Sequence, residues 1–292
     1  MSRILPVTVL VAVRNEAPNL AKCLKALTRA QKVIVIDSNS TDGTAEIAVQ
    51  LGATVLQFQY RGTYPKKRQW AIDHADITTG WILLVDADEE VTPELWDEIE
   101  AAIQSRDHAA YFVTKSFHFL GRRLRFGGFS FASILLFKRG TARFEETLAE
   151  STSGLDMEVH ERLIVEGSVG RLRSPIIHND FKNLQAFVDR HNKYSTWEAE
   201  LRHKFLTTGR YGEKRVSSKL LGNTQEFRRA VKSVVMRMPF EASLWWSYHI
   251  IFRLGFLEGR RGWEAARIRA NYINDVRAKL YERKLGERGH TG

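Results

Sequence analysis

Four carboxylates follow directly on an apolar run between Trp81 and Glu90. The run Trp81–Val85 has the composition of a buried strand in a parallel sheet, and such sheets bind ligands at the carboxyl ends of their strands. Asp86 and Asp88 are two residues apart, so on a strand both side chains point to one face, about 6–7 Å apart. Because Mg²⁺ usually takes one or two carboxylates plus phosphate oxygens, these residues predict a divalent metal that carries a diphosphate.

The same carboxylates also suit the beginning of a helix. Thr92-Pro93-Glu94 has the residue types of a helix N-terminus, and acidic side chains are favoured in the first turn. We therefore expect Glu90 to belong to the helix start. The role of Glu89 stays open.

A second apolar run, Lys32–Asp37, also ends in a carboxylate. An acidic residue at the end of the second strand can accept hydrogen bonds from a ribose hydroxyl or a base edge. Alternatively, Asp37 caps the turn formed with Ser38 and Ser40. The residues alone favour neither interpretation.

A basic segment, Pro65-Lys-Lys-Arg68, begins the third predicted helix. Its three cations near backbone N–H groups could face a diphosphate, or they could form a solvated turn. The first strand is not followed by G-x-G-x-x-G, and the chain has no G-x-x-x-x-G-K-[ST]. Both the dinucleotide-binding fingerprint and the P-loop are thereby excluded.

Strand patterns alternate with helical patterns along the first half of the chain. We expect strands at Val7–Val13, Lys32–Asp37, Ala53–Phe58, Trp81–Asp86, Ala109–Phe119 and Ile134–Lys138. We expect helices after Asn15, which we predict as a cap, and at Thr44–Leu51, Lys66–His74 and Pro93–Gln104. This alternation predicts an α/β fold with a mostly parallel, Rossmann-like sheet flanked by helices. The single cysteine, Cys23, lies at helical spacing among leucines and is predicted to be a core residue.

The positive charge is concentrated in the last third of the chain. Residues 181–292 contain 23 Lys and Arg against 11 Asp and Glu, whereas the whole chain has a net charge of +10. Met236–Gly255 is rich in aromatic and aliphatic residues and bracketed by arginines, as in a helix that lies on an anionic membrane. A core helix is the alternative. No stretch has the 18–20 or so apolar residues that span a bilayer. We expect a catalytic domain over 1–180 and a helical, basic, membrane-associating region over 181–292.

Four segments together resemble the nucleotide-sugar glycosyltransferases of family 2. They are Val11-Ala-Val-Arg-Asn15-Glu16, Val35-Ile-Asp37-Ser-Asn-Ser-Thr-Asp42-Gly-Thr, Lys66-Lys-Arg68-Gln-Trp-Ala-Ile and Trp81-Ile-Leu-Leu-Val-Asp86-Ala-Asp88-Glu89. Each is weak alone, but four in this order are specific. Later segments resemble the bacterial lipopolysaccharide core-biosynthesis branch, whose members add a hexose to the inner core at the cytoplasmic membrane. These are Val159-His160-Glu161-Arg-Leu, Ile177-His178-Asn-Asp180 and Arg253-Leu-Gly255-Phe-Leu-Glu-Gly259.

The resemblance implies a GT-A fold and a role for each matching residue. Asp37 would contact the base or ribose of the nucleotide, and Arg68 the base or phosphates. Asp86 would support the nucleotide, while Asp88 would bind the divalent metal, Mg²⁺ or Mn²⁺. Gln69 stands where many relatives have Asn, so no contact is assigned to that position. The base pocket would be lined by Val11, Val13 and Glu16.

The resemblance also implies an inverting single displacement. The metal and Arg68 would stabilise the departing nucleoside diphosphate, and a carboxylate would take the proton of the acceptor hydroxyl. Glu161 is the first candidate for this base and Asp180 the second. The implied partners are a nucleotide-sugar donor, with UDP as the expected nucleotide, a glycolipid or lipopolysaccharide acceptor and an anionic membrane surface. We expect the protein in the cytoplasm, peripheral on the inner face of the cell membrane.

Three other functions compete with this interpretation. A transferase to polyprenyl phosphate needs no base, because its acceptor phosphate is already a nucleophile. A nucleic-acid-binding protein would explain the basic region, but the region lacks an RNP, KH or zinc-finger signature, so no nucleic acid is expected. A nucleotidyltransferase would need a glycine-rich loop near the N-terminus, which the chain lacks.

Overall fold

The computed structural model describes residues 3–105, 107–146, 162–179, 183–209 and 231–289. They form two compact units. Within the described residues, the first unit comprises 3–118, 130–144 and 162–179, and the second comprises 119–129, 145–146 and the chain from residue 183 onward. The segment Phe119–Phe129 thus belongs with the C-terminal helices although it lies early in the sequence.

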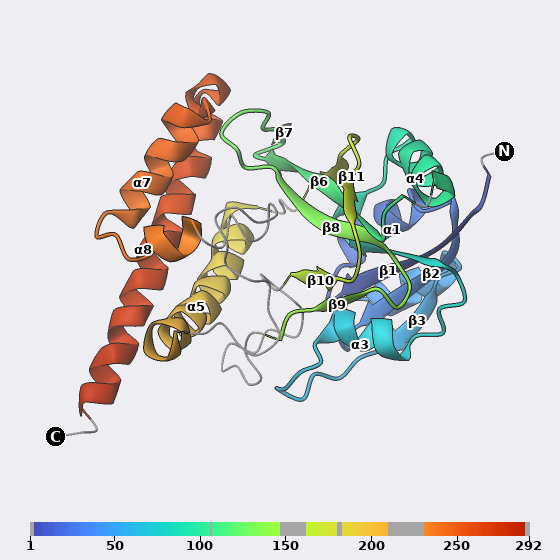
Figure 1. The fold of residues 1–292 in the computed structure, drawn as a ribbon, viewed down its shortest axis with the longest axis horizontal. Helices are drawn as coiled ribbons and strands as arrows, with labels where there is room; N and C mark the ends of the chain where they lie inside the picture. Colours follow the sequence, from blue (N-terminus) through green and yellow to red (C-terminus); the bar gives the residue numbers. More distant parts are fainter. Residues whose placement is uncertain (1–2, 106, 147–161, 180–182, 210–230, 290–292) are drawn as a thin grey trace. The chain divides into compact units, whose positions relative to one another are not determined.

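The first unit is built on a mostly parallel β-sheet (Figure 1). Its strands lie in the order β3-β2-β1-β4-β8-β6-β12-β5, and β11 pairs with β6 outside this path. β8 runs antiparallel to β4 and β6, and β5 runs antiparallel to β12, whereas β1 is parallel to β2 and β4, β2 is parallel to β3, and β6 is parallel to β11 and β12. The strands are β1 (Leu5–Val13), β2 (Ala30–Asp37), β3 (Thr54–Gln57), β4 (Trp81–Asp86), β5 (Glu89–Glu90), β6 (Ala110–Phe119), β8 (Phe131–Lys138), β11 (Val169–Arg171) and β12 (Ile176–His178). The predicted α/β class is confirmed.

Helices connect the parallel strands as the sequence pattern predicts. They are α1 (Ala17–Lys25), α2 (Thr44–Gln50), α3 (Lys67–His74) and α4 (Pro93–Ser105). The central strands β1 and β4 bury almost every side chain, as strands covered on both faces must. The antiparallel pair β9 (Ala142–Phe144) and β10 (Leu163–Val165) completes the described part of this unit.

Two sequence predictions at helix starts are wrong. Asn15 does not cap α1, whose N-cap is Glu16; instead Asn15 adopts a positive φ of 54° and bonds to the loop after β2. Glu90 lies in β5, not in the helix start, and pairs with Ile177 of β12. The helix start is supplied by Thr92, whose hydroxyl accepts a hydrogen bond from the Leu95 N–H at 3.2 Å.

The second unit is helical. Its elements are β7 (Arg122–Arg123), α5 (Leu184–Thr208), α7 (Glu241–Ser247), a π-helix η1 (Tyr248–Phe252), a 3₁₀-helix η2 (Gly255–Glu258) and α8 (Arg260–Gly289). Asn183 caps α5 by accepting a hydrogen bond from the Ala186 N–H at 2.8 Å. Helices α5 and α7 both pack against α8, around a small core that includes Ala199, Tyr272 and Val276.

The predicted single helix over Met236–Gly255 is replaced by three short elements. The chain passes from α7 into the π-helix and then turns at Leu254, which has a φ of 58°. Among the described helices, none is both long enough and apolar enough to cross a bilayer.

Candidate active site

Parallel register brings the two predicted strand-end carboxylates to one edge of the sheet. Val13 of β1 pairs with Asp37 of β2, and Ala12 of β1 pairs with Asp86 of β4. Asp37 and Asp86 therefore flank the carboxyl end of β1, the place where open α/β sheets bind ligands. The structure thus brings both aspartates to a common site.

Asp37 is almost completely buried within the loop that follows β2. Its carboxylate accepts hydrogen bonds from the Ser40 N–H at 3.1 and 3.2 Å, from the Ser40 hydroxyl, and from the Gln57 side chain at 3.1 Å. The turn-capping interpretation of Asp37 is therefore correct as far as Ser40 is concerned. A contact with a nucleotide stays a prediction.

Hydrogen bonds join the loop after β1 to the loop after β2. The Asn15 N–H donates to the Ser40 hydroxyl at 2.8 Å, and the Glu16 N–H donates to the Thr44 hydroxyl at 2.9 Å. Asp42 accepts from the Ala17 N–H at 3.1 Å. These bonds fix the two loops against each other, so the predicted base pocket is preorganised. Two of its predicted lining residues, Val11 and Val13, bury their side chains in the core, and Glu16 is half-buried and bonds Asn19 at 2.8 Å.

Asp86 is the centre of a buried ion cluster. It pairs with Arg68 of α3 and with Lys115 of β6, whose ammonium nitrogen lies 2.8 Å from the carboxylate. Burial alone raises the pKa of Asp86, but the charges of Arg68 and Lys115 outweigh this effect and hold the pKa well below its usual range. Asp86 is thus a permanent anion that orients Arg68.

Lys115 is a site residue that the sequence did not reveal. Its ammonium group also lies 2.6 Å from Glu89, so one cation joins two carboxylates. Burial lowers the pKa of Lys115, but Asp86 and Glu89 raise it above its usual value, which keeps the side chain charged. In the sequence, Lys115 is a single lysine within an apolar strand, and its side chain could equally face solvent.

Asp88 lies beside His178, which the register of three strands brings into place. His178 pairs with Glu89 across β5 and β12 and with Phe117 across β12 and β6. Its Nδ1 lies 3.6 Å from an Asp88 oxygen and 3.4 Å from Glu89 Oε1. Burial lowers the pKa of His178, but its contact with Glu89 and the charges of Asp88 and Glu89 raise it to about 9.

The carboxylate of Asp88 fits a divalent metal that is shared with a diphosphate. His178 Nδ1 and Glu89 Oε1 are buried yet make no aligned hydrogen bond, although they form ion-pair contacts. Within the described residues no three His, Cys, Asp or Glu side chains are grouped to hold a metal alone. One or two protein donors with phosphate oxygens and water are the usual set for Mg²⁺. Asp88, with His178 as its neighbour, is therefore the best-placed metal ligand.

The basic segment before α3 is not a solvated turn. Lys66 and Lys67 are each 1% exposed, and the Lys67 ammonium donates to the Val13 carbonyl at 2.8 Å. Lys67 therefore secures the end of β1. Gln69 is also structural, because it accepts a hydrogen bond from the Phe144 N–H at 2.7 Å and donates to Asp73 at 2.8 Å. Of this segment, Arg68 is the side chain whose guanidinium joins the carboxylate cluster.

The two candidate bases, Glu161 and Asp180, lie outside the described residues. The described chain reaches Asn179, whose N–H donates to the Asp88 carbonyl at 3.0 Å. Cys23 is buried as predicted, and burial together with the charges of Glu89 and Asp88 raises the pKa of its thiol far above the usual value. Cys23 is thus unsuited to act as a nucleophile.

Comparison with known proteins decides the family. Residues 8–153, half of the chain, match the family model described as Glycosyl transferase family 2. The chain belongs to glycosyltransferase family 2. The four segments named above lie within the matched residues, and the α/β sheet of the first unit and the helical C-terminal region agree with the GT-A fold.

Two relatives illustrate this family 2 membership. The lipopolysaccharide core biosynthesis glycosyltransferase LpsC of Rhizobium meliloti (strain 1021) is 26% identical over 210 residues, 67% of this chain and 71% of that protein. An uncharacterized glycosyltransferase of Rickettsia felis is 27% identical over 201 residues, 66% of this chain and 69% of that protein.

Solved structures give weaker likenesses. The mannosyltransferase PcManGT from Pyrobaculum calidifontis, in complex with GDP-Man and Mn²⁺, is 16% identical with a TM-score of 0.46, covering 96% of this chain and 88% of its own. S. aureus TarS 1-349 in complex with UDP-GlcNAc is 15% identical with a TM-score of 0.41, covering 97% and 92%.

Proposed function

We propose that this glycosyltransferase moves a hexose from a nucleoside-diphosphate sugar of the UDP class to a lipid-linked saccharide, with inversion at the anomeric carbon. The observation that carries the proposal is the register of β1, β2 and β4. It sets Asp37 and Asp86 on either side of one strand end, with Asp88 two residues further on. A nucleotide can be held at such an edge by its base, ribose and diphosphate.

Each part of the donor has a candidate partner at this edge. Asp37 suits the ribose or base, because hydroxyl and amino groups can donate to its carboxylate. Arg68 suits the diphosphate, because guanidinium binds phosphate oxygens in a bidentate way. The pairing with Asp86 fixes the direction in which Arg68 points, so little side-chain entropy is lost on binding.

Asp88 would hold a divalent metal, Mg²⁺ or Mn²⁺, with His178 beside it. When bound, such an ion supplies positive charge that stabilises the diphosphate as it departs. The chain itself supplies Arg68 for the same purpose. Lys115 keeps Asp86 and Glu89 in fixed positions, so the cluster does not reorganise when the charge of the leaving group develops.

The reaction is a single displacement. The acceptor hydroxyl oxygen forms a bond to the anomeric carbon on the face opposite the diphosphate, and the bond from that carbon to the diphosphate oxygen breaks. The bonding electrons leave with the nucleoside diphosphate. The hydroxyl proton passes to a carboxylate, for which Glu161 is the first candidate and Asp180 the second.

A lipid-linked acceptor and an anionic membrane surface are supported by the second unit. Large apolar side chains are exposed on α7, η1 and η2, and arginines flank them. Phe252 is 77% exposed and Phe240 is 72% exposed. A nucleic-acid-binding surface needs cations but no large exposed apolar side chains, so the exposed residues favour lipid. LpsC is named as a lipopolysaccharide core biosynthesis glycosyltransferase, so the lipopolysaccharide core is the acceptor to test first. Within this proposal the sugar goes to the inner core, at the cytoplasmic face of the cell membrane.

A thermal-shift screen of nucleotide sugars with Mn²⁺ tests the donor. A ligand at about 100 times its Kd adds about 2.7 kcal/mol to the stability of the folded protein. We expect a UDP-sugar to give the largest increase in melting temperature. The same melting temperature with every nucleotide sugar, with and without metal, would exclude the proposal. The variant Glu161→Gln then separates the acceptors: full activity would favour polyprenyl phosphate, which needs no base.

A further inference from the structure

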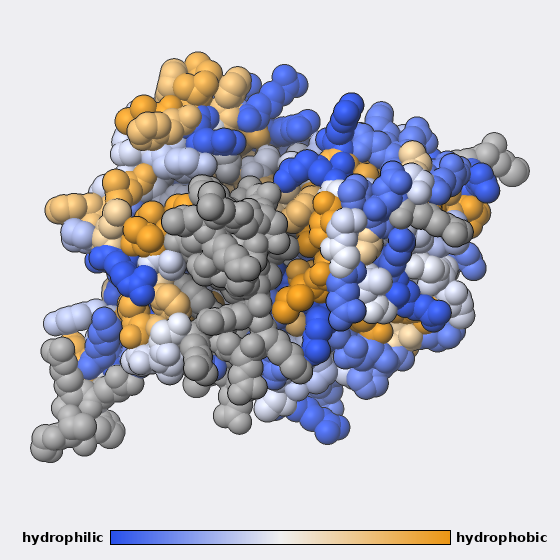
Figure 2. Space-filling view, in the orientation of Figure 1, coloured by the Kyte–Doolittle hydropathy of each residue, from blue (hydrophilic) through white to orange (hydrophobic). Residues whose placement is uncertain are grey.

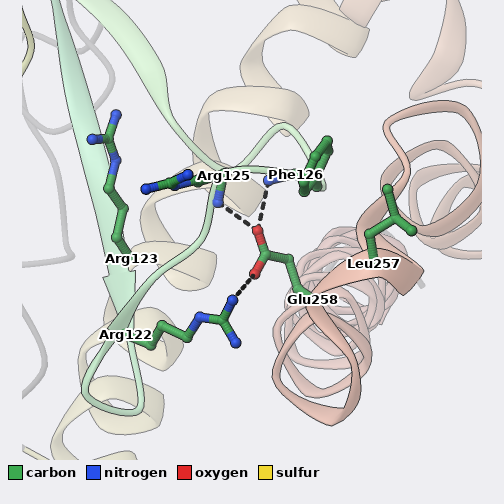
Figure 3. A pocket seen from close by; sticks show the side chains of 6 residues that line it. All are labelled: Arg122, Arg123, Arg125, Phe126, Leu257 and Glu258. Carbon is green, nitrogen blue, oxygen red and sulfur yellow. Dashed lines mark hydrogen bonds and ion pairs between the residues drawn. The ribbon is translucent and has the colours of Figure 1, made fainter.

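A cavity of about 420 Å³ lies within the C-terminal unit (Figure 3). The side chains that line it are Arg122, Arg123, Arg125, Phe126, Leu257 and Glu258. Three of the six are arginines and one is a carboxylate, so the lining has an excess of positive charge. A guanidinium group binds phosphate well, because its N–H fork matches two phosphate oxygens.

The single carboxylate of the cavity is already engaged. Glu258 is buried and accepts hydrogen bonds from the N–H groups of Arg125 at 2.5 Å and Phe126 at 2.8 Å. Its other oxygen lies 4.0 Å from the guanidinium of Arg122. Figure 3 marks this ion pair with a dashed line. Within the described part of the chain, Arg123 and Arg125 form no ion pair with a carboxylate. Their charges are therefore available to an anion.

The loop that carries the arginines is fixed in place. The Gly127 N–H donates to the Arg253 carbonyl at 2.8 Å. The Gly127 carbonyl also lies 2.6 Å from His249 Nδ1. A Cβ atom on Gly128, which has a φ of 65°, would come within 2.7 Å of the Arg253 side chain. The close packing shows that the cavity is built into the fold.

Exposed apolar side chains border the cavity. Phe126 and Leu257 line it and are themselves exposed, and the neighbouring Phe252, Leu254 and Phe256 are also exposed. Figure 2 shows apolar side chains gathered over the part of this unit that contains α7 and the start of α8. Water-soluble surfaces seldom expose so much contiguous apolar area unless it meets a partner.

We propose that this cavity binds the phosphate of an anionic phospholipid headgroup while the apolar side chains around it enter the lipid. The inference rests on the membrane contact put forward under Proposed function and names its chemistry. A free phosphate would neutralise the arginines but leave the apolar side chains around the cavity exposed. A neutral lipid would cover the apolar side chains but leave the arginines without an anion. A phosphate on an apolar carrier satisfies both at once.

The test compares vesicles of phosphatidylcholine with vesicles that also contain phosphatidylglycerol. In the full-length protein, Arg122, Arg123 and Arg125 are changed together to Gln. The matched control changes Lys193, Arg267 and Lys284 to Gln; all three are exposed residues of the same unit, and the loss of charge is equal. We expect the cavity variant to bind phosphatidylglycerol vesicles at least about tenfold more weakly than the control variant. Equal binding by the two variants would overturn the inference.

Two further arms keep the result decisive. Replacing the three arginines by Lys preserves net charge but removes the guanidinium fork, so vesicle binding should still fall; unchanged binding overturns the inference even if the Gln variant does not fold. Inorganic phosphate serves as the second probe. If it binds the cavity tightly while phosphatidylglycerol vesicles are not preferred over phosphatidylcholine, the cavity is a site for free anions and the inference fails.

Binding of UDP with Mn²⁺ is measured on the same proteins. Wild-type protein that binds UDP but not phosphatidylglycerol vesicles would refute the lipid site and leave the sugar-transfer proposal intact. Wild-type protein that binds phosphatidylglycerol vesicles but not UDP would refute the sugar-transfer proposal and leave the lipid site intact.

Discussion

The ammonium group of Lys115 lies 2.8 Å from the carboxylate of Asp86 and joins β6 to the end of β4. A second contact, 2.6 Å to Glu89, makes Lys115 the cation between two carboxylates. All three side chains are largely or fully buried. Removing one partner of a buried ion cluster leaves the remaining buried charges less well compensated, which costs more than a surface pair contributes.

We therefore expect Lys115→Met to lower the free energy of unfolding by about 3–5 kcal/mol. It should also weaken nucleotide binding, because Asp86 would lose a partner that holds it beside Arg68. Urea unfolding measures the first effect. The control is Lys32→Met, which breaks an ion pair with the exposed Asp76 and should cost under about 1 kcal/mol. Similar costs for the two variants would mean that the cluster contributes little.

Asp37 offers a test of the base and ribose side of the site. In Asp37→Asn an amide nitrogen replaces an oxygen that accepts hydrogen bonds from Ser40 or Gln57. The loop then loses a partner and the ribose hydroxyl loses a charged acceptor, so we expect UDP to bind about tenfold more weakly, equivalent to about 1.4 kcal/mol. Calorimetry measures this, with Asp76→Asn as the surface control. Wild-type affinity in Asp37→Asn would restrict Asp37 to its role in the turn.

The C-terminal unit contains its own buried ion cluster. Arg202 donates to Glu198 at 2.7 and 2.9 Å and to Glu241 at 2.8 and 2.9 Å, and all three side chains are at most 3% exposed. We expect Arg202→Met to destabilise the protein by about 3–5 kcal/mol, because two buried carboxylates would lose the cation that joins them and keep only Lys232 at 2.9 Å and Arg277 at 3.6 Å. Arg267→Met, which breaks an exposed pair with Glu264, is the control for thermal unfolding. A loss below about 1 kcal/mol in Arg202→Met would contradict this expectation.

Tyr272 gives a prediction for the pH dependence of stability. Burial and the adjacent Glu198, whose oxygen lies 2.6 Å from the tyrosine hydroxyl, raise the pKa of Tyr272 well above 10. Above about pH 10 the unfolded chain releases this proton while the native state retains it, so stability falls as the pH rises. The contribution is fully present below that pH.

The variant Tyr272→Phe isolates this contribution. It should lose about 1 kcal/mol at about pH 8, where the hydrogen bond to Glu198 is removed. Between about pH 9 and 11 its stability should then decline less steeply than that of the wild type, which chemical unfolding can follow. Parallel curves for the two proteins would show that Tyr272 ionises as readily in the native state as in the unfolded chain.

The sheet was predictable because its central strands are buried on both faces. Val7–Val13 and Trp81–Asp86 are continuous apolar runs, and only such runs fit between neighbouring strands and covering helices. Asp86 ends the second of these runs, and Asp37 ends the apolar run of the neighbouring strand β2, so the edge of the sheet that holds the site could be predicted from the sequence.

Features that depend on long-range register were not predictable. The sequence gives no sign that Lys115 is buried, and its partners Asp86 and Glu89 come from strands β4 and β5, some 25 to 30 residues earlier. The acidic residues before Thr92 predict a helix start that includes Glu90. In the structure Glu90 pairs with Ile177 in a strand of only two residues, which is too short to leave a pattern in the sequence. The helix predicted over Met236–Gly255 is broken at Leu254, beside a glycine that packs against the His249 carbonyl. Composition carries no signal for such contacts.

The most direct test of the central claim is a calorimetric titration of UDP in the presence of Mn²⁺. Wild-type protein should bind UDP, and removing the metal with EDTA should abolish most of the affinity. Asp88→Ala should bind UDP with Mn²⁺ at least about tenfold more weakly, because a metal ligand is lost. The control Asp97→Asn, which alters an exposed carboxylate paired with Arg29, should behave as the wild type. Wild-type affinity in Asp88→Ala, with and without metal, would contradict a metal-assisted nucleotide-sugar site at the end of β4.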